Sequence, residues 1–245
     1  MQSGKFPAML VAGLAVVVFG TAGCGGSSST PIHPATTLIT VQNGDQWQYN
    51  ITGTATPTGG GQALPITGTA IINTGSTTVN AQPALVFSIA SNVSVNGAAA
   101  VQIVQDIYFT QDVNGNLIEV QQSLQDSSGV KTKTVTTPSL ANSEIFPGTF
   151  SNGETVAETI DFTDTTSEAY KLVVGAPAQE TTPAGVFNTW PTTITIGGAA
   201  QGTEFWDPAI GMFVQGTINT GNVDVSGTNY NLSISYALTK VTLAP

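Results

Sequence analysis

Apolar and polar residues alternate with a period of two through most of this chain, and this alternation constrains the fold more than any other feature. In the stretch QWQYNIT, Trp47, Tyr49 and Ile51 fall on one face, while the polar residues between them fall on the other. Successive side chains of a strand point to opposite sides of a sheet, so the pattern predicts a half-buried strand.

The same pattern recurs along the chain between short turns rich in Gly, Asn, Pro and Asp. It predicts further strands at 63–73, 84–95, 101–110, 117–124, 130–136, 155–162, 170–174, 187–196, 203–206, 212–218 and 229–241. One segment, Ser139 to Phe146, has the spacing and the capping serine of a short helix. The fold class expected is mainly β: a curved antiparallel sheet, half-barrel or sandwich-like, with at most one or two short helices.

Several turns and pairings are also predicted. Asn114-Gly115 lies between two apolar runs and predicts a hairpin. Gly185 follows Pro183-Ala184 and is expected at positive φ, and Pro208 and Gly211 are expected to turn a late hairpin. The sequence ITGTA occurs twice, starting at Ile51 and Ile66, and predicts two strands that pair with each other.

The first residues have the order of a secretory signal. Lys5 precedes an apolar stretch at 6–20, and the small residues 21–23 follow it, so residues 1–23 are expected to be a signal peptide. Ala22 and Gly23 directly before Cys24 resemble the lipobox of bacterial lipoproteins. The resemblance implies that Cys24 is acylated (as in palmitate-bearing lipoproteins) and anchors the chain to a membrane. Two alternatives remain open: an ordinary signal with Cys24 as a spectator, and an uncleaved signal anchor.

Composition predicts the remaining organisation and excludes several functions. Residues 24–37 are expected to be a Gly/Ser/Pro tether and residues 38–245 a single β domain. The chain has no arginine and a net charge of −10, so nucleic-acid binding is not expected. With one cysteine it cannot form an internal disulfide. His33 is the only histidine and lies in the tether, so neither a Ser-His-Asp triad nor a zinc site is expected. We therefore expect no catalytic residues, no metal and no cofactor, and a protein that is not an enzyme.

Four spaced elements carry a resemblance to a known group: GDQWQY (44–49), IFPGTFSNGETV (145–156), TTPAGVFNTW (181–190) and FWDPAIGMFVQG (205–216). Together they resemble a broad, uncharacterised group of bacterial extracytoplasmic lipoproteins, built on a curved antiparallel sheet similar to that of the LolA/LolB lipoprotein carriers. The resemblance implies an extracytoplasmic location, lipid-anchored to the cell envelope at the outer membrane or the cell surface.

Two functions are compatible with these observations. In the first, the curved sheet encloses an apolar groove for a hydrophobic or lipidic ligand, with Trp206, Phe205 and Trp190 as groove candidates. Trp206 is the preferred candidate, because Glu204 and Asp207 are expected to hold its hairpin near solvent. In the second, the domain is a structural or protein-interaction module on the envelope surface.

Two smaller expectations concern the same residues. Trp47 is expected in the core, because Tyr49 and Ile51 share its face. Glu204 and Asp207 would suggest a glycosidase pair, but strand alternation would place them on opposite faces, which disfavours that reading.

Overall fold

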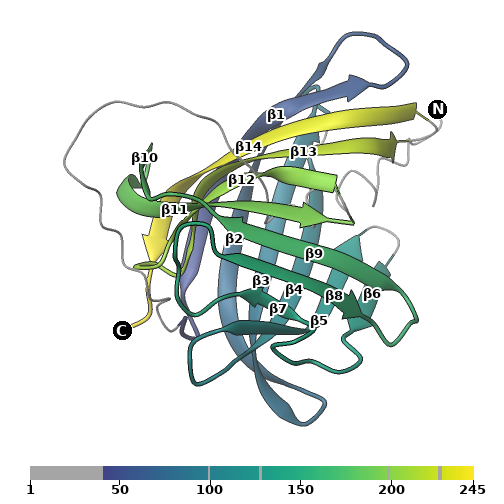
Figure 1. Cartoon of the computed structure of the whole chain (residues 1–245). Helices are drawn as coiled ribbons and strands as arrows, with labels where there is room; N and C mark the ends of the chain where they lie inside the picture. The colour runs from purple at the N-terminus through teal and green to yellow at the C-terminus, as the bar shows by residue number, and fades with distance from the viewer. Residues whose placement is uncertain (1–40, 99, 127–128, 198, 226–227) are drawn as a thin grey trace.

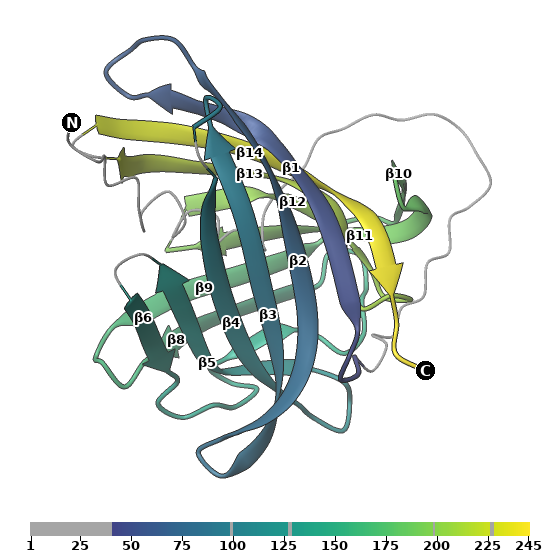
Figure 2. The same cartoon turned by 180° about the vertical axis from the view of Figure 1, so that it is seen from behind.

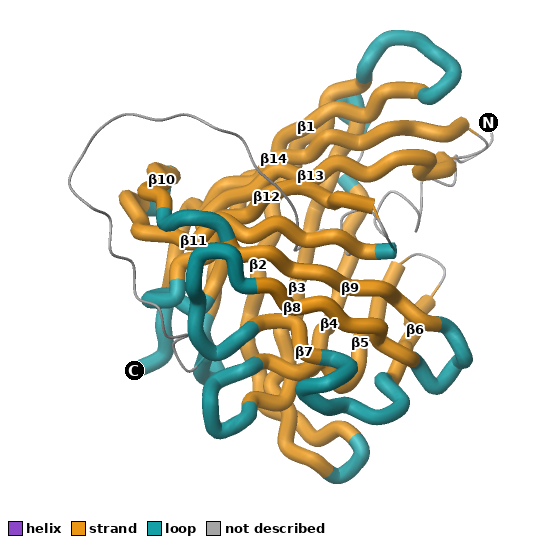
Figure 3. The backbone as a smooth tube through the Cα atoms, viewed as in Figure 1, coloured by secondary structure: helices purple, strands orange, loops and turns teal. Residues whose placement is uncertain are grey.

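The structure is a computed structural model that describes residues 41–98, 100–126, 129–197, 199–225 and 228–245. These residues form fourteen strands and no helix (Figure 3). The strands are β1 (Gln46–Pro57), β2 (Leu64–Val79), β3 (Gln82–Val95), β4 (Val101–Gln111), β5 (Leu117–Asp126), β6 (Gly129–Thr134), β7 (Glu144–Phe146), β8 (Thr155–Asp161), β9 (Ser167–Val174), β10 (Ala178–Thr182), β11 (Gly185–Ile196), β12 (Ala199–Asp207), β13 (Met212–Val225) and β14 (Thr228–Thr242).

All fourteen strands belong to one antiparallel sheet. Its order is β6-β5-β4-β3-β2-β1-β14-β13-β12-β11-β9-β8, with β10 paired to β11 and β7 paired to β5. Figures 1 and 2 show that β2–β6 form one wall and β8, β9, β11 and β12 the facing wall, with β1, β14 and β13 curving between them. The curved antiparallel sheet expected from the alternation is confirmed.

Among the described residues, the two outer strands of the sheet, β6 and β8, are joined by a single isolated bridge just beyond their ends. There Val135 and Phe162, just beyond β6 and β8, form an isolated antiparallel bridge. The backbone amide of Thr136 donates to the carbonyl of Asp161, and that of Thr163 to the carbonyl of Thr134, both at 2.8 Å. The edges therefore touch without a continuous ladder, and the sheet is not closed into a barrel.

The repeated ITGTA segments pair with each other, as expected. Ile51 in β1 lies opposite Gly68 in β2, and Gly53 lies opposite Ile66. Ile51 and Ile66 are both buried, so each copy contributes one isoleucine to the inner face of the sheet.

The turns predicted from the sequence are also present. Asp112 closes the β4–β5 hairpin by accepting hydrogen bonds from the amides of Asn114 (2.8 Å) and Asn116 (3.0 Å), and Gly115 has a φ of 89°. Gly185 has a φ of 141°, between β10 and β11.

The prediction of a short helix from Ser139 to Phe146 is wrong. Only one helical turn forms, in which the amide of Ser143 donates to the carbonyl of Ser139 at 3.0 Å. The chain then extends as β7, and Ile145 and Phe146 are buried in the core. Pairing with β5 outweighs a local helix preference that is weak over so few residues.

Candidate functional site

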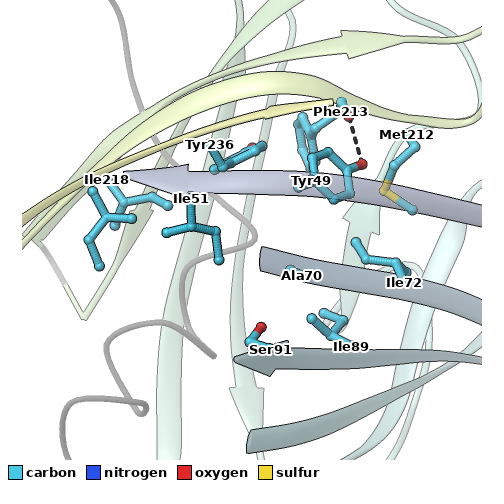
Figure 4. Close-up of a pocket in the computed structure, with 11 residues that line it drawn as sticks. Tyr49, Ile51, Ala70, Ile72, Ile89, Ser91, Met212, Phe213, Ile218 and Tyr236 are labelled. Atoms are coloured by element: carbon cyan, nitrogen blue, oxygen red, sulfur yellow. Dashed lines mark hydrogen bonds between the residues drawn. The ribbon is translucent and has the colours of Figure 1, made fainter. Parts of the chain in front are cut away.

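An apolar pocket lies on the inner face of the sheet, between β1–β3 on one side and β13 and β14 on the other (Figure 4). Its cavity volume is ≈ 50 Å³. Every lining side chain except that of Ser91 is hydrophobic or aromatic. The lining residues are Tyr49, Ile51, Ala70, Ile72, Ile89, Ser91, Met212, Phe213, Ile218, Ile234 and Tyr236.

The strand register explains why the pocket forms at this point. Ala70 of β2 lies directly opposite Ser91 of β3, and the next inward pair along the strands is Ile72 opposite Ile89. Directly opposite side chains are close neighbours on a sheet, so two small ones leave a hollow beside two large ones. On the other side of Ala70 lies Tyr49 of β1. The hollow is therefore bounded by isoleucine and tyrosine side chains.

Tyr49 and Tyr236 form the polar end of the pocket lining. The hydroxyl group of each already donates a hydrogen bond. The Tyr49 hydroxyl donates to the carbonyl of Phe213 at 2.8 Å, and the Tyr236 hydroxyl donates to the carboxylate of Glu204. The two rings meet edge to face, with centroids 5.5 Å apart. The tyrosines therefore present mainly ring carbon to the pocket.

Electrostatics keep both tyrosines in the neutral form. Burial raises the pKa of each hydroxyl well above its ordinary value, and the nearby charge of Glu204 raises it further. Glu204 is itself fully buried. It reaches Tyr236 across Gly216 of β13, which lies opposite both residues in the register.

The three groove candidates from the sequence lie elsewhere. Trp206 and Trp190 are buried in the main core, with exposed fractions of 1% and 6%, and Phe205 is half-buried against it. None of the three lines the apolar pocket. Trp206 borders a smaller cavity of ≈ 10 Å³.

The expectation that Trp206 sits near solvent is wrong, because its acidic neighbours are buried too. Glu204 turns inward to Tyr236. Asp207 is 6% exposed and accepts a hydrogen bond from the amide of Ala209 at 2.8 Å, which fixes the β12–β13 turn. Burial raises the pKa of Asp207. A register shift between Phe205 and Trp206 interrupts the alternation on which the opposite-face argument rested.

Aromatic rings also enclose Trp206 directly. It stacks on Phe146 with centroids 4.6 Å apart and meets Phe213 edge to face at 4.7 Å. Phe146 comes from β7, a strand that the sequence did not predict. Trp47, by contrast, is in the core as expected, with an exposed fraction of 0%.

Two other findings concern chemistry and membranes. Among the described residues, no group of three or more His, Cys, Asp or Glu side chains could hold a metal ion. The same part of the chain contains no helix long and apolar enough to cross a membrane. Cys24, the expected signal peptide (residues 1–23) and His33 lie outside the described residues.

No protein-family model and no curated protein matches the sequence. Solved structures with a related outline do match. One is a β-barrel-like protein of the domain family DUF1849 from Brucella abortus, at 14% identity and a TM-score of 0.46, covering 84% of this chain and all of that one.

Two further matches come from other bacteria. A candidate exported protein with a YmcC-like fold from Bacteroides fragilis has 10% identity and a TM-score of 0.35, covering 84% of this chain and 99% of that one. A candidate lipoprotein from Parabacteroides distasonis has 11% identity and a TM-score of 0.36, covering 86% and 100%. At such identities and TM-scores the matches carry no information on ligand or activity, and none of the three descriptions names LolA or LolB.

Proposed function

We propose that this chain is an extracytoplasmic lipoprotein, anchored to the cell envelope through Cys24, whose non-catalytic β domain binds a hydrophobic or lipidic ligand in the apolar pocket. The alternative is a structural or protein-interaction module on the envelope surface. The proposed fold relationship to the LolA/LolB carriers is compatible with the first function, because a curved sheet can cover one side of an acyl chain.

The pocket itself is the observation that supports ligand binding. A hollow lined by isoleucines and aromatic rings, with its two tyrosine hydroxyl groups already hydrogen-bonded in the wall, offers contact to hydrocarbon and few polar groups. Filling it with water would leave that water short of partners. The exposed large hydrophobic residues, in contrast, come from separate strands, turns and the C-terminal end: Ile71, Val113, Val130, Leu140, Val186 and Leu243.

Native mass spectrometry of the full-length protein, extracted from its membrane, tests this proposal. We expect a lipid-sized mass that is lost on collisional activation, and that can thereby be told apart from acyl groups bound covalently at Cys24. Ala70→Leu should reduce the fraction of protein carrying this mass, because the larger side chain fills the hollow opposite Ser91. The Leu variant should keep a melting temperature close to that of the original chain, since it grows into free space.

Thr69→Leu is the matched control. It adds a leucine at the neighbouring position of β2, where the side chain is exposed on the outer face, and it should leave the bound fraction unchanged. A protein that carries no such mass, or one whose bound mass is insensitive to Ala70→Leu, would favour the interaction module instead.

A further inference from the structure

A second, polar cavity lies in the same interior, away from the apolar pocket. It is lined by residues of β4, β5, β7, β8, β9 and β11, and its volume is ≈ 30 Å³. Its polar lining consists of two carboxyl groups, two amides and one phenol: Glu119, Glu168, Gln105, Gln122 and Tyr170. The rest of the lining is apolar: Ile107, Phe109, Ile145, Ile160 and Ile196.

Two polar side chains that line this cavity are buried, and each has one oxygen without a partner among the described residues. Glu119 is 7% exposed and Gln105 is 6% exposed, and one side-chain oxygen of each has no hydrogen-bond partner among the described residues. A buried acceptor without a partner is costly, and such groups are normally satisfied by protein, water or ligand. Both oxygens belong to residues that line one cavity, so a single guest can approach both.

The two side-chain atoms of this lining that lack a partner among the described residues, Glu119 Oε1 and Gln105 Oε1, are both oxygens that can accept hydrogen bonds. Tyr170 donates its hydroxyl hydrogen to the carbonyl of Ile145 at 2.8 Å. Glu168, half-buried on β9, adds a second carboxyl group. A primary ammonium group has three donors, no acceptor and a positive charge, and therefore matches this set. The isoleucines around it suit a short alkyl chain.

We propose that this cavity is a binding site for a protonated primary alkylamine, with the ammonium group between Glu119, Glu168 and Gln105 and the alkyl group against the isoleucines. The site is separate from the apolar pocket and shares no lining residue with it. It therefore stands whether or not the apolar pocket binds a lipid.

The charges around Glu119 give the binding a pH dependence. The pKa of Glu119 is raised from 4.5 to about 8, mainly by burial and also by the charge of Glu168 on β9, while Lys133 on β6 acts to lower it. Tyr170, on β9, is held neutral by burial. The ammonium group favours the ionised carboxylate, so the bound amine displaces the Glu119 proton into solvent. Affinity should therefore rise as the pH increases toward about 8.

Calorimetric titration of the full-length chain in phosphatidylcholine nanodiscs tests the site, with n-butylamine as the probe and n-butanol as its neutral match. We expect saturable binding of butylamine and at least about tenfold weaker binding of butanol, since hydrogen bonds to charged groups are the stronger ones. Glu119→Gln should weaken amine binding by about tenfold or more and remove its pH dependence. Glu168→Gln is a second variant that tests the same site should the first fold poorly.

Two controls separate this proposal from other causes. Asp106→Asn removes the same charge from β4 at the position next to Gln105, which alternation places on the outer face. Ala70→Leu fills the apolar pocket only. Both variants should bind butylamine like the original chain. Equal binding of butylamine and butanol, or unchanged amine binding in both glutamine variants, would overturn the proposal.

Discussion

Trp206 and Trp47 are both enclosed tryptophans, with exposed fractions of 1% and 0%. We therefore expect Trp206→Ala and Trp47→Ala each to lower the free energy of unfolding by about 3–5 kcal/mol, through lost transfer energy and the cavity left behind. Urea unfolding of the two variants measures this. Trp206→Phe should retain much of the stability, because a ring still stacks on Phe146. Near-original stability of Trp206→Ala would show that this side chain is not a core residue.

Glu119 makes the stability of the domain depend on pH. Its pKa is about 8 in the folded chain and near 4.5 when unfolded. Between these values the unfolded state has released the proton and the folded state retains it. The free energy of unfolding therefore falls as the pH rises, by about 1.4 kcal/mol per pH unit for this one group. Below the lower value and above the upper one, the contribution is constant.

Urea unfolding at several pH values between about 5 and about 8 tests this linkage. The original chain and Asp106→Asn should lose stability across the range, whereas Glu119→Gln should lose markedly less. A Glu119→Gln variant that loses stability as steeply as the original chain would show that Glu119 is ionised in the folded state.

At the scale of single elements, Gly216 of β13 allows the Glu204–Tyr236 hydrogen bond to form. A Cβ atom at this position would lie 2.7 Å from the Tyr236 hydroxyl oxygen and 2.9 Å from the Glu204 Cγ. Gly216→Ala should therefore lower the free energy of unfolding by about 1–3 kcal/mol, the usual range for overpacking.

Thermal melts of Gly216→Ala and Gly221→Ala measure this effect. Gly221 lies on the same strand, but a Cβ atom there would meet only the Asn231 side-chain oxygen, at 3.3 Å. That variant should be much closer to the original chain. Equal melting temperatures for the two variants would mean that the Tyr236 and Glu204 side chains can move aside for the added methyl group without loss of stability.

The long strands could be predicted from the sequence because their alternation is local information. The stretch around Trp47, Tyr49 and Ile51 identifies β1 without any knowledge of its partners. β7 and β10 were missed because three and five residues are too short for a clear period. Their pairing with β5 and β11 stabilises them instead.

The site could not be predicted because it depends on register. The hollow exists where Ala70 meets Ser91, and neither residue is unusual in its own strand. The wrong expectation for Trp206 has the same origin. The ring of Phe146 covers Trp206, and Phe146 lies sixty residues earlier in the chain. The polar cavity joins Glu119 and Glu168 across two walls of the sheet. Alternation identifies the inward face but not which inward residues meet.

For the whole molecule, the proposed lipid anchor predicts where the protein is found. Cys24→Ser removes the thiol that would receive the acyl group, so the variant should move from the membrane fraction to the soluble extracytoplasmic fraction. Cell fractionation followed by immunoblotting measures this. A Ser variant that is processed at the same site and stays in the membrane fraction would contradict anchoring through Cys24.

The central claim is that the rolled sheet holds a hydrocarbon ligand between β1–β3 and β13–β14. A crystal structure of the full-length protein tests it most directly, if the protein is purified from its native membrane in a steroid detergent that lacks an alkyl chain. We predict continuous, elongated density in the apolar pocket, in contact with Ala70, Ile89 and Ile218. A pocket that holds only separate ordered water molecules, or that is empty, would contradict the claim.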